Sequence, residues 1–111
     1  MKVAVVGSRT IQTLCMEYYI PKEATVIVSG GARGIDALAK EYAQRKGLQL
    51  VEFPPDYQRF GKSAPLIRNR QIVEYCDCVV AIWDGFSTGT MQVVQLARKM
   101  KKPVSVYTLR V

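Results

Sequence analysis

The fold is decided by residues 25–47, TVIVSGGARGIDALAKEYAQRKG. The first four residues of this stretch are β-branched and mostly apolar, as is typical of a strand covered on both faces in a parallel sheet. After a glycine-rich turn, apolar residues recur at the spacing of one helix face, at Ile35, Leu38, Ala39, Tyr42 and Ala43. Gly47 stands just past the end of this pattern, where helices commonly terminate. The stretch therefore predicts a strand, a tight turn and an amphipathic helix.

The same alternation continues along the chain. Short β-branched runs predict five strands, near residues 2–6, 25–28, 49–53, 78–82 and 103–107. Helical spacing occurs between them, at residues 11–18, 35–46, 63–76 and 93–100. Such alternation with short connections favours right-handed crossovers and parallel strands. We predict an α/β fold, a single Rossmann-like three-layer α/β/α sandwich with a mainly parallel five-stranded sheet, in which residues 1–111 form one domain.

The composition indicates an ordinary cytoplasmic protein. Hydrophobic residues make up 49% and charged residues 23%, and no apolar run is long enough for a membrane-spanning helix. The first residues lack the pattern of a signal peptide. Three cysteines, Cys15, Cys76 and Cys78, cannot all pair within one chain, and they lack the second pair that a zinc site needs. We expect free thiols in a reducing compartment, no metal site and no membrane association.

Charge and the absence of histidine limit the chemistry. The chain has no histidine, which excludes hydrolases with a histidine base and histidine-bound metals. The net charge is +7, from sixteen basic and nine acidic residues, which favours anionic partners such as nucleotides or nucleic acid. Part of this excess, at residues 98–102, falls at a helix end, where it complements the helix dipole.

A ligand site is expected where the predicted strands end. In doubly wound sheets, ligands bind beyond the carboxyl ends of the strands, where the strand order reverses. Two glycine turns, at residues 29–34 and 85–90, follow predicted strands and would hold a nucleotide phosphate and sugar, with charge supplied by Arg9 or Arg33. The predicted ligand-binding residues are Gly7, Ser8, Arg9, Ser29, Gly30, Gly31, Ala32, Arg33, Gly34, Arg68, Asn69, Gly85, Ser87, Thr88, Gly89 and Thr90.

Purely structural roles remain open for these turns. The first has a serine at the first glycine position of the dinucleotide fingerprint and lacks the lysine of a Walker loop, so it could be a tight turn without a ligand. Thr88 or Thr90 could simply cap the helix that follows. Asp36 is expected in the first helical turn, where its charge favours the dipole more than it suits catalysis.

Arg68 and Asn69 are expected to face inward. They share helical stripes with Ile72 and Val73, which should pack on the sheet. Polar groups on such a stripe need partners. Either carbonyl groups of neighbouring loops or a ligand could supply them. Arg70 points elsewhere and is expected to be a surface charge.

The motifs resemble those of the SLOG superfamily, which unites the DNA-processing protein DprA (Smf) with the LOG nucleotide phosphoribohydrolases. They are VGSR at residues 6–9, VSGGARGID at 28–36, IRNR at 67–70 and STGT at 87–90. Residues 61–69, GKSAPLIRN, are most similar to small stand-alone SLOG proteins of bacteria and phages. The resemblance covers nearly the whole chain and implies a Rossmann-like fold with a nucleotide or nucleic-acid site formed by these loops.

The resemblance also implies where activity should be missing. LOG enzymes carry a glutamate after their Gly-Thr pair, and alignment on Gly89-Thr90 places Val93 at that position. Our leading hypothesis is therefore a protein that senses, carries or sequesters a nucleotide or nucleotide-derived ligand, with no catalytic residue and no required cofactor. The alternatives are a DprA-like single-stranded DNA-binding protein, with Tyr57 and Phe60 available for stacking, and a nucleotide N-glycosidase that uses Asp84 or Asp56. Association into a homo-oligomer stays open.

Overall fold

The structure, a computed structural model, describes residues 1–109. Its elements are, in chain order, β1 (Lys2–Gly7), η1 (Met16–Tyr18), β2 (Val26–Ser29), α1 (Ile35–Lys46), β3 (Gln49–Glu52), α2 (Tyr57–Phe60), η2 (Gly61–Ser63), α3 (Ala64–Tyr75), β4 (Cys78–Trp83), α4 (Thr88–Lys99) and β5 (Val104–Thr108). All five predicted strands are confirmed, with ends within one residue of the prediction. Among the helices of residues 1–109, none has the length and apolarity needed to cross a membrane.

The five strands form one sheet in the order β3-β2-β1-β4-β5, and every neighbouring pair is parallel. β1 is central, and successive strands are added first on its β2 side and then on its β4 side. The strand order therefore reverses between β1 and β4, which confirms the doubly wound Rossmann-like prediction.

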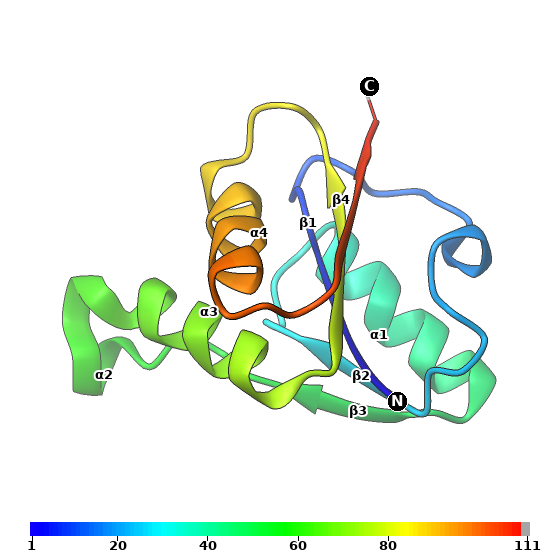
Figure 1. Ribbon diagram of the computed structural model, residues 1–111, viewed down its shortest axis with the longest axis horizontal. Helices are drawn as coiled ribbons and strands as arrows, with labels where there is room; N and C mark the ends of the chain where they lie inside the picture. The colour runs from blue at the N-terminus through cyan, green and yellow to red at the C-terminus, as the bar shows by residue number, and fades with distance from the viewer. Residues whose placement is uncertain (110–111) are drawn as a thin grey trace.

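Helices cover both faces of the sheet. Figure 1 shows α1 on one face and α3 with α4 on the other. In β1, Val3 and Val5 pack in the cluster that includes α1, whereas Ala4 and Val6 pack in the cluster that includes α3 and α4. The middle residues of β1 thus have apolar neighbours whichever way they point, and β1 and β4, which are each buried over four consecutive residues, have nearly continuous apolar sequences.

The helix predicted at residues 11–18 is wrong. The segment contains only the short 3-10 turn η1, and its Cys15 N-cap makes no side-chain hydrogen bond. Its deeply buried side chains are Ile11 and Met16, followed by Ile20, a spacing that does not place them on one helix face. They join the core on the α1 side of the sheet, so the segment acts as an irregular cover over that face.

The short helix α2 was not expected from the sequence. The two prolines Pro54 and Pro55 follow β3, and Asp56 then caps α2 by accepting a hydrogen bond from the Arg59 amide at 3.1 Å. This segment projects beyond the sheet at the α3 side of the molecule (Figure 1). It borders a second cavity, described below.

Candidate functional site

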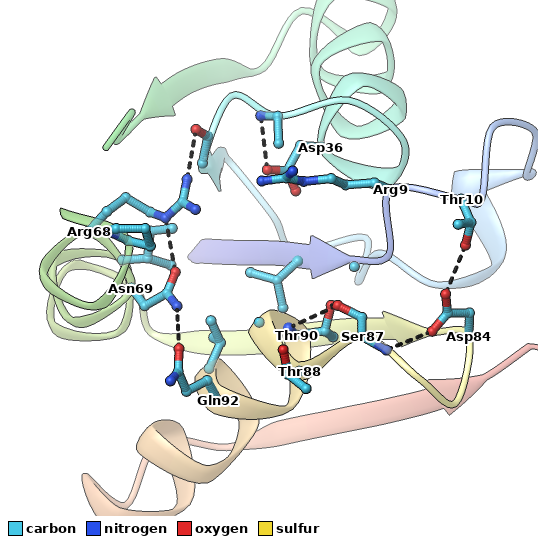
Figure 2. Close-up of a pocket in the computed structure, with 18 of the residues that line it drawn as sticks. Arg9, Thr10, Asp36, Arg68, Asn69, Asp84, Ser87, Thr88, Thr90 and Gln92 are labelled. Atoms are coloured by element: carbon cyan, nitrogen blue, oxygen red, sulfur yellow. Dashed lines mark hydrogen bonds between the residues drawn. The ribbon is translucent and has the colours of Figure 1, made fainter. Parts of the chain in front are cut away.

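A cavity of about 570 Å³ lies at the carboxyl ends of β1, β2 and β4 (Figure 2). It is next to the point where the strand order reverses, which is where the sequence predicted a site. Its size falls within the range of about 300–1,000 Å³ typical of small-molecule sites. The lining residues are Val6, Gly7, Arg9, Thr10, Gly30, Ala32, Asp36, Pro65, Arg68, Asn69, Ile72, Asp84, Phe86, Ser87, Thr88, Gly89, Thr90, Gln92 and Val93.

Ser8 joins the three loops that border the cavity. Its backbone amide donates to the Ile82 carbonyl at 3.1 Å, and its hydroxyl accepts from the Asp84 amide at 2.9 Å. Its carbonyl accepts from the Ile35 amide at 3.3 Å, which fixes the start of α1. Ser8 is 1% exposed and does not line the cavity. Ser8, which the sequence predicted to bind a ligand, therefore uses its hydrogen bonds to hold the neighbouring loops in place.

Asp84 fixes the turn between β4 and α4. One carboxylate oxygen accepts from the amides of Phe86 at 2.8 Å and Ser87 at 2.9 Å, and the other accepts from the Thr10 hydroxyl at 2.8 Å. The Phe86 and Ser87 amides stabilise the charged form and lower the pKa of Asp84 to about 2. The Trp83 indole donates to the Ser87 carbonyl at 2.9 Å, which holds the other end of the turn. The turn is thus defined by its own hydrogen bonds.

The N-terminus of α4 points into the cavity. Ser87 is the N-cap, since its hydroxyl accepts from the Thr90 amide at 3.3 Å, so the suggestion that Thr88 or Thr90 is the cap is wrong. The Thr90 hydroxyl lies 3.0 Å from the Ser87 hydroxyl. Gly89 faces open space, because an added Cβ there would meet no atom within 4 Å. The first turn of α4, where helix amides carry partial positive charge, therefore lines the cavity and is open at Gly89.

Arg68 and Asn69 connect α3 to the loop after β2. The Arg68 guanidinium donates to the Gly30 carbonyl at 3.1 Å and to the Asn69 side-chain oxygen at 2.9 Å. The Asn69 amide group donates in turn to Gln92 of α4 at 3.3 Å. The expected inward orientation and the loop-carbonyl partner are both confirmed. Arg68 also lines the cavity, so one side chain both holds the loop and contributes positive charge to the cavity wall.

Asp36 lies in the first turn of α1, as predicted, but its side chain is turned toward the cavity. It is 8% exposed and accepts a hydrogen bond from the Ala32 amide at 3.1 Å. Burial raises the pKa of its carboxyl group, while the Ala32 amide and the charge of Arg68 act in the opposite direction. The structure thus adds a buried acid to the site, where the sequence indicated a dipole role alone.

The predicted residues divide into two groups. Those that line the cavity are Gly7, Arg9, Gly30, Ala32, Arg68, Asn69, Ser87, Thr88, Gly89 and Thr90. Those that lie outside its lining are Ser8, Ser29, Gly31, Arg33, Gly34 and Gly85. Arg33 is exposed, and Gly31 faces Glu52 rather than the cavity. Of the two arginines proposed to supply charge, the structure therefore places Arg9 at the cavity.

Sequence reasoning did not place several lining residues at the site. Thr10 directly follows the VGSR motif and Gln92 lies two residues beyond STGT, so both could have been found by extending each motif by one or two residues. Phe86 stands within the second glycine turn and is 86% exposed. Val93, at the position of the LOG glutamate, is 3% exposed and contributes an apolar wall.

Within residues 1–109, no group of three or more histidine, cysteine or acidic side chains is arranged to hold a metal ion. The cavity presents arginines, hydroxyls, helix amides and one buried acid instead.

Comparison with known families agrees with these features. A family model described as the YspA, cpYpsA-related SLOG family (YAcAr) matches residues 1–60. This region contains β1, the loop with Arg9 that follows it, β2, and α1 with Asp36 in its first turn. The chain belongs to this SLOG family. A search among curated proteins finds no match for the SLOG protein.

A solved structure of DNA processing protein A from Helicobacter pylori is similar to this SLOG protein, with 26% sequence identity and a TM-score of 0.77. The similarity covers all of the SLOG chain and 66% of the H. pylori chain, so the SLOG protein spans just under two thirds of that length. The H. pylori structure describes a single-stranded DNA binding mode. The likeness confirms the Rossmann-like fold and the resemblance to DprA.

Proposed function

We propose that this SLOG protein binds a nucleotide or nucleotide-derived ligand in the cavity, as a module that senses, carries or sequesters it. One observation carries the proposal: the N-terminus of α4 and two arginines, Arg9 and Arg68, border the same cavity. Amide donors and positive charge together form a site for phosphate. The net charge of +7 supports an anionic ligand.

The phosphate would lie against the first turn of α4. The first amides of a helix have no partner within it and carry partial positive charge. The exposed backbone at Gly89 allows close approach, and the hydroxyls of Ser87 and Thr88 provide further donors. Because the Asp84 hydrogen bonds already define this turn, little ordering would accompany binding.

Asp36 would contact the sugar. A carboxylate can accept hydrogen bonds from ribose hydroxyls. Asp36 lines the cavity, and its orientation is fixed by the Ala32 amide. The positive charges of Arg68 and Arg9 attract this carboxylate. The group that would bind the sugar therefore interacts electrostatically with the groups that would bind the phosphate.

Replacing Arg9 with alanine is expected to weaken binding of a nucleoside monophosphate about 10-fold, because charged hydrogen bonds to phosphate contribute modestly where water screens them. Arg9 is exposed at the edge of the cavity. Isothermal titration calorimetry with ribo- and deoxynucleoside monophosphates of all four bases measures the effect.

Arg33→Ala is the matched control for this experiment. It removes the same charge from an exposed position outside the cavity, and its affinity should stay at the wild-type value. Equal losses in both variants would show that general charge, rather than this cavity, attracts the ligand. If no nucleotide binds below millimolar concentration, the proposed function is wrong.

A nucleotide N-glycosidase is a second candidate, favoured by the buried acid Asp36. We nevertheless expect no release of free base from nucleoside monophosphates. Asp84, with its pKa near 2, is ionised at neutral pH and cannot donate a proton, while Val93 occupies the LOG glutamate position. Chromatography of overnight incubations measures the product. Base release that scales with protein concentration and disappears in Asp36→Asn would contradict this expectation.

Single-stranded DNA is a further candidate ligand, favoured by the similarity to the H. pylori DNA processing protein A. The two ligand classes differ in their salt dependence. Affinity for a strand that contacts several phosphates should fall by orders of magnitude between low and physiological salt, whereas affinity for a mononucleotide changes far less. Titrations of both ligands across that range assign the class.

A further inference from the structure

A second cavity, of about 410 Å³, lies on the other side of Arg68. It is bordered by the end of β3, the two prolines after it, α2 and residues 64–71 of α3. Arg68 lines this cavity as well as the first one. The two cavities are therefore adjacent, with one guanidinium in the lining of both.

The second cavity is suited to a flat uncharged group. Its lining includes two aromatic residues, Phe53 and Phe60, and the Arg59 guanidinium lies over the Phe60 ring, 5.2 Å from its centroid. Aromatic rings and arginine planes are surfaces on which nucleic-acid bases stack. Gln71 lines the same cavity and is exposed, and its amide can both donate to and accept from the edge of a base.

The charges of this cavity disfavour a phosphate inside it. Glu52 and Asp56 balance Arg59 and Arg68, so the ionisable side chains of the lining have no net charge. One Asp56 oxygen is already used to cap α2. A neutral base with exocyclic amino groups is compatible with the two carboxylates, whereas a phosphate would be repelled by them.

Arg68 is placed to contact a group that bridges the cavities. Its guanidinium has five N–H donors, and the protein uses those that reach Gly30 and Asn69. The others remain for a ligand. In a nucleic-acid strand, the group between two successive nucleosides is a phosphodiester, which an arginine binds well.

We propose that the ligand contains two nucleotides joined by a phosphodiester, with the first nucleotide in the cavity at α4, the phosphodiester at Arg68 and the second base against Phe60. This inference rests on the proposed function and specifies its ligand class. A free dinucleotide and a strand of single-stranded nucleic acid share this chemistry.

The test compares 5′-phosphorylated ligands of one, two and three nucleotides, in each of the four bases, with the full chain. Stacking of one base on an aromatic side chain predicts that the second nucleotide raises affinity about 10-fold or more. The third nucleotide, which has no further cavity in this proposal, should add much less. If no dinucleotide binds more tightly than its mononucleotide, the proposal is overturned.

Two variants assign the gain to this cavity. Phe60→Leu keeps an apolar side chain but removes the ring, and Gln71→Glu adds a charge at an exposed position. Both should reduce the dinucleotide gain and leave mononucleotide affinity unchanged. Tyr18→Leu, an aromatic replacement at a side chain that is 83% exposed and outside both cavities, is the control. A gain that survives in both cavity variants would overturn the assignment.

The experiment separates the two proposals. If mononucleotides bind in an Arg9-dependent way but the second nucleotide adds nothing, the two-nucleotide ligand is wrong and the proposed function stands. If no mononucleotide or dinucleotide binds, both fail. If the dinucleotide does bind more tightly than the mononucleotide, a ten-nucleotide strand distinguishes a free dinucleotide from a nucleic-acid strand. Tighter and strongly salt-dependent binding of the ten-nucleotide strand supports a strand as the ligand. Affinity equal to that of the dinucleotide supports a free dinucleotide.

Discussion

Replacing Gly34 with alanine is expected to lower the free energy of unfolding by about 4 kcal/mol, from backbone strain and overpacking together. Gly34 precedes α1 with φ +75° and ψ −128°, a conformation that residues with a Cβ rarely adopt. An added Cβ would lie 2.5 Å from the Ser8 carbonyl oxygen and 2.6 Å from the Arg9 Cα. Both are backbone atoms of the loop after β1, so relief of the clash would displace a wall of the site.

Gly47→Ala is the matched control. Gly47 ends α1 with φ +69°, but an added Cβ would meet no atom within 4 Å. Its replacement should cost only about 1 kcal/mol, the strain of a left-handed residue. Urea denaturation of both variants measures the difference. Equal losses would show that the close contact between Gly34 and the β1 loop contributes nothing to stability.

The strands and α1 could be predicted because local pattern and tertiary environment agree. β1 is covered on both faces, so its buried residues 3–6 are all apolar and the run is visible in the sequence. Gly47 adopts the left-handed conformation that its place after Lys46 predicted. These patterns depend on residues that are close in the sequence, and the packing of the folded protein favours the same conformations.

The segment at residues 11–18 shows where pattern reasoning fails. Its apolar residues could be arranged on a helix face, but burial of Ile11 and Met16 depends on the shape of the sheet face beneath them. That shape is set by strands far along the chain. The short helix α2 depends on a single cap, Asp56, which a sequence pattern does not distinguish from a turn.

The position of the cavity was predictable, but the direction of its side chains was not. The rule for doubly wound sheets indicated the loops that border this cavity, since it depends only on topology. Whether Arg9 or Arg33 faces the cavity depends on how the loops after β1 and β2 pack against each other. The inward turn of Asp36 likewise follows from its hydrogen bond to Ala32, which no spacing rule indicates.

Replacing Arg68 with methionine is expected to weaken nucleoside monophosphate binding about 100-fold, because loss of a partly buried, hydrogen-bonded charge costs several kcal/mol of affinity. Arg70→Met is the control on the same helix. Arg70 is exposed, and its Nε lies 2.7 Å from Glu74, so its removal should leave affinity unchanged. Calorimetric titration measures both affinities, and thermal melts confirm that both variants are folded.

Arg68→Lys separates charge from geometry. If the site needed only a positive charge, lysine would restore most of the affinity. A lysine carries its charge on one nitrogen, and it cannot reproduce the fork that reaches both Gly30 and Asn69. Without that fork the loop after β2 loses its link to α3, so the walls of both cavities lose their shared support. We therefore expect Arg68→Lys to resemble Arg68→Met in affinity, and near-complete rescue by lysine would show that Arg68 acts through charge alone.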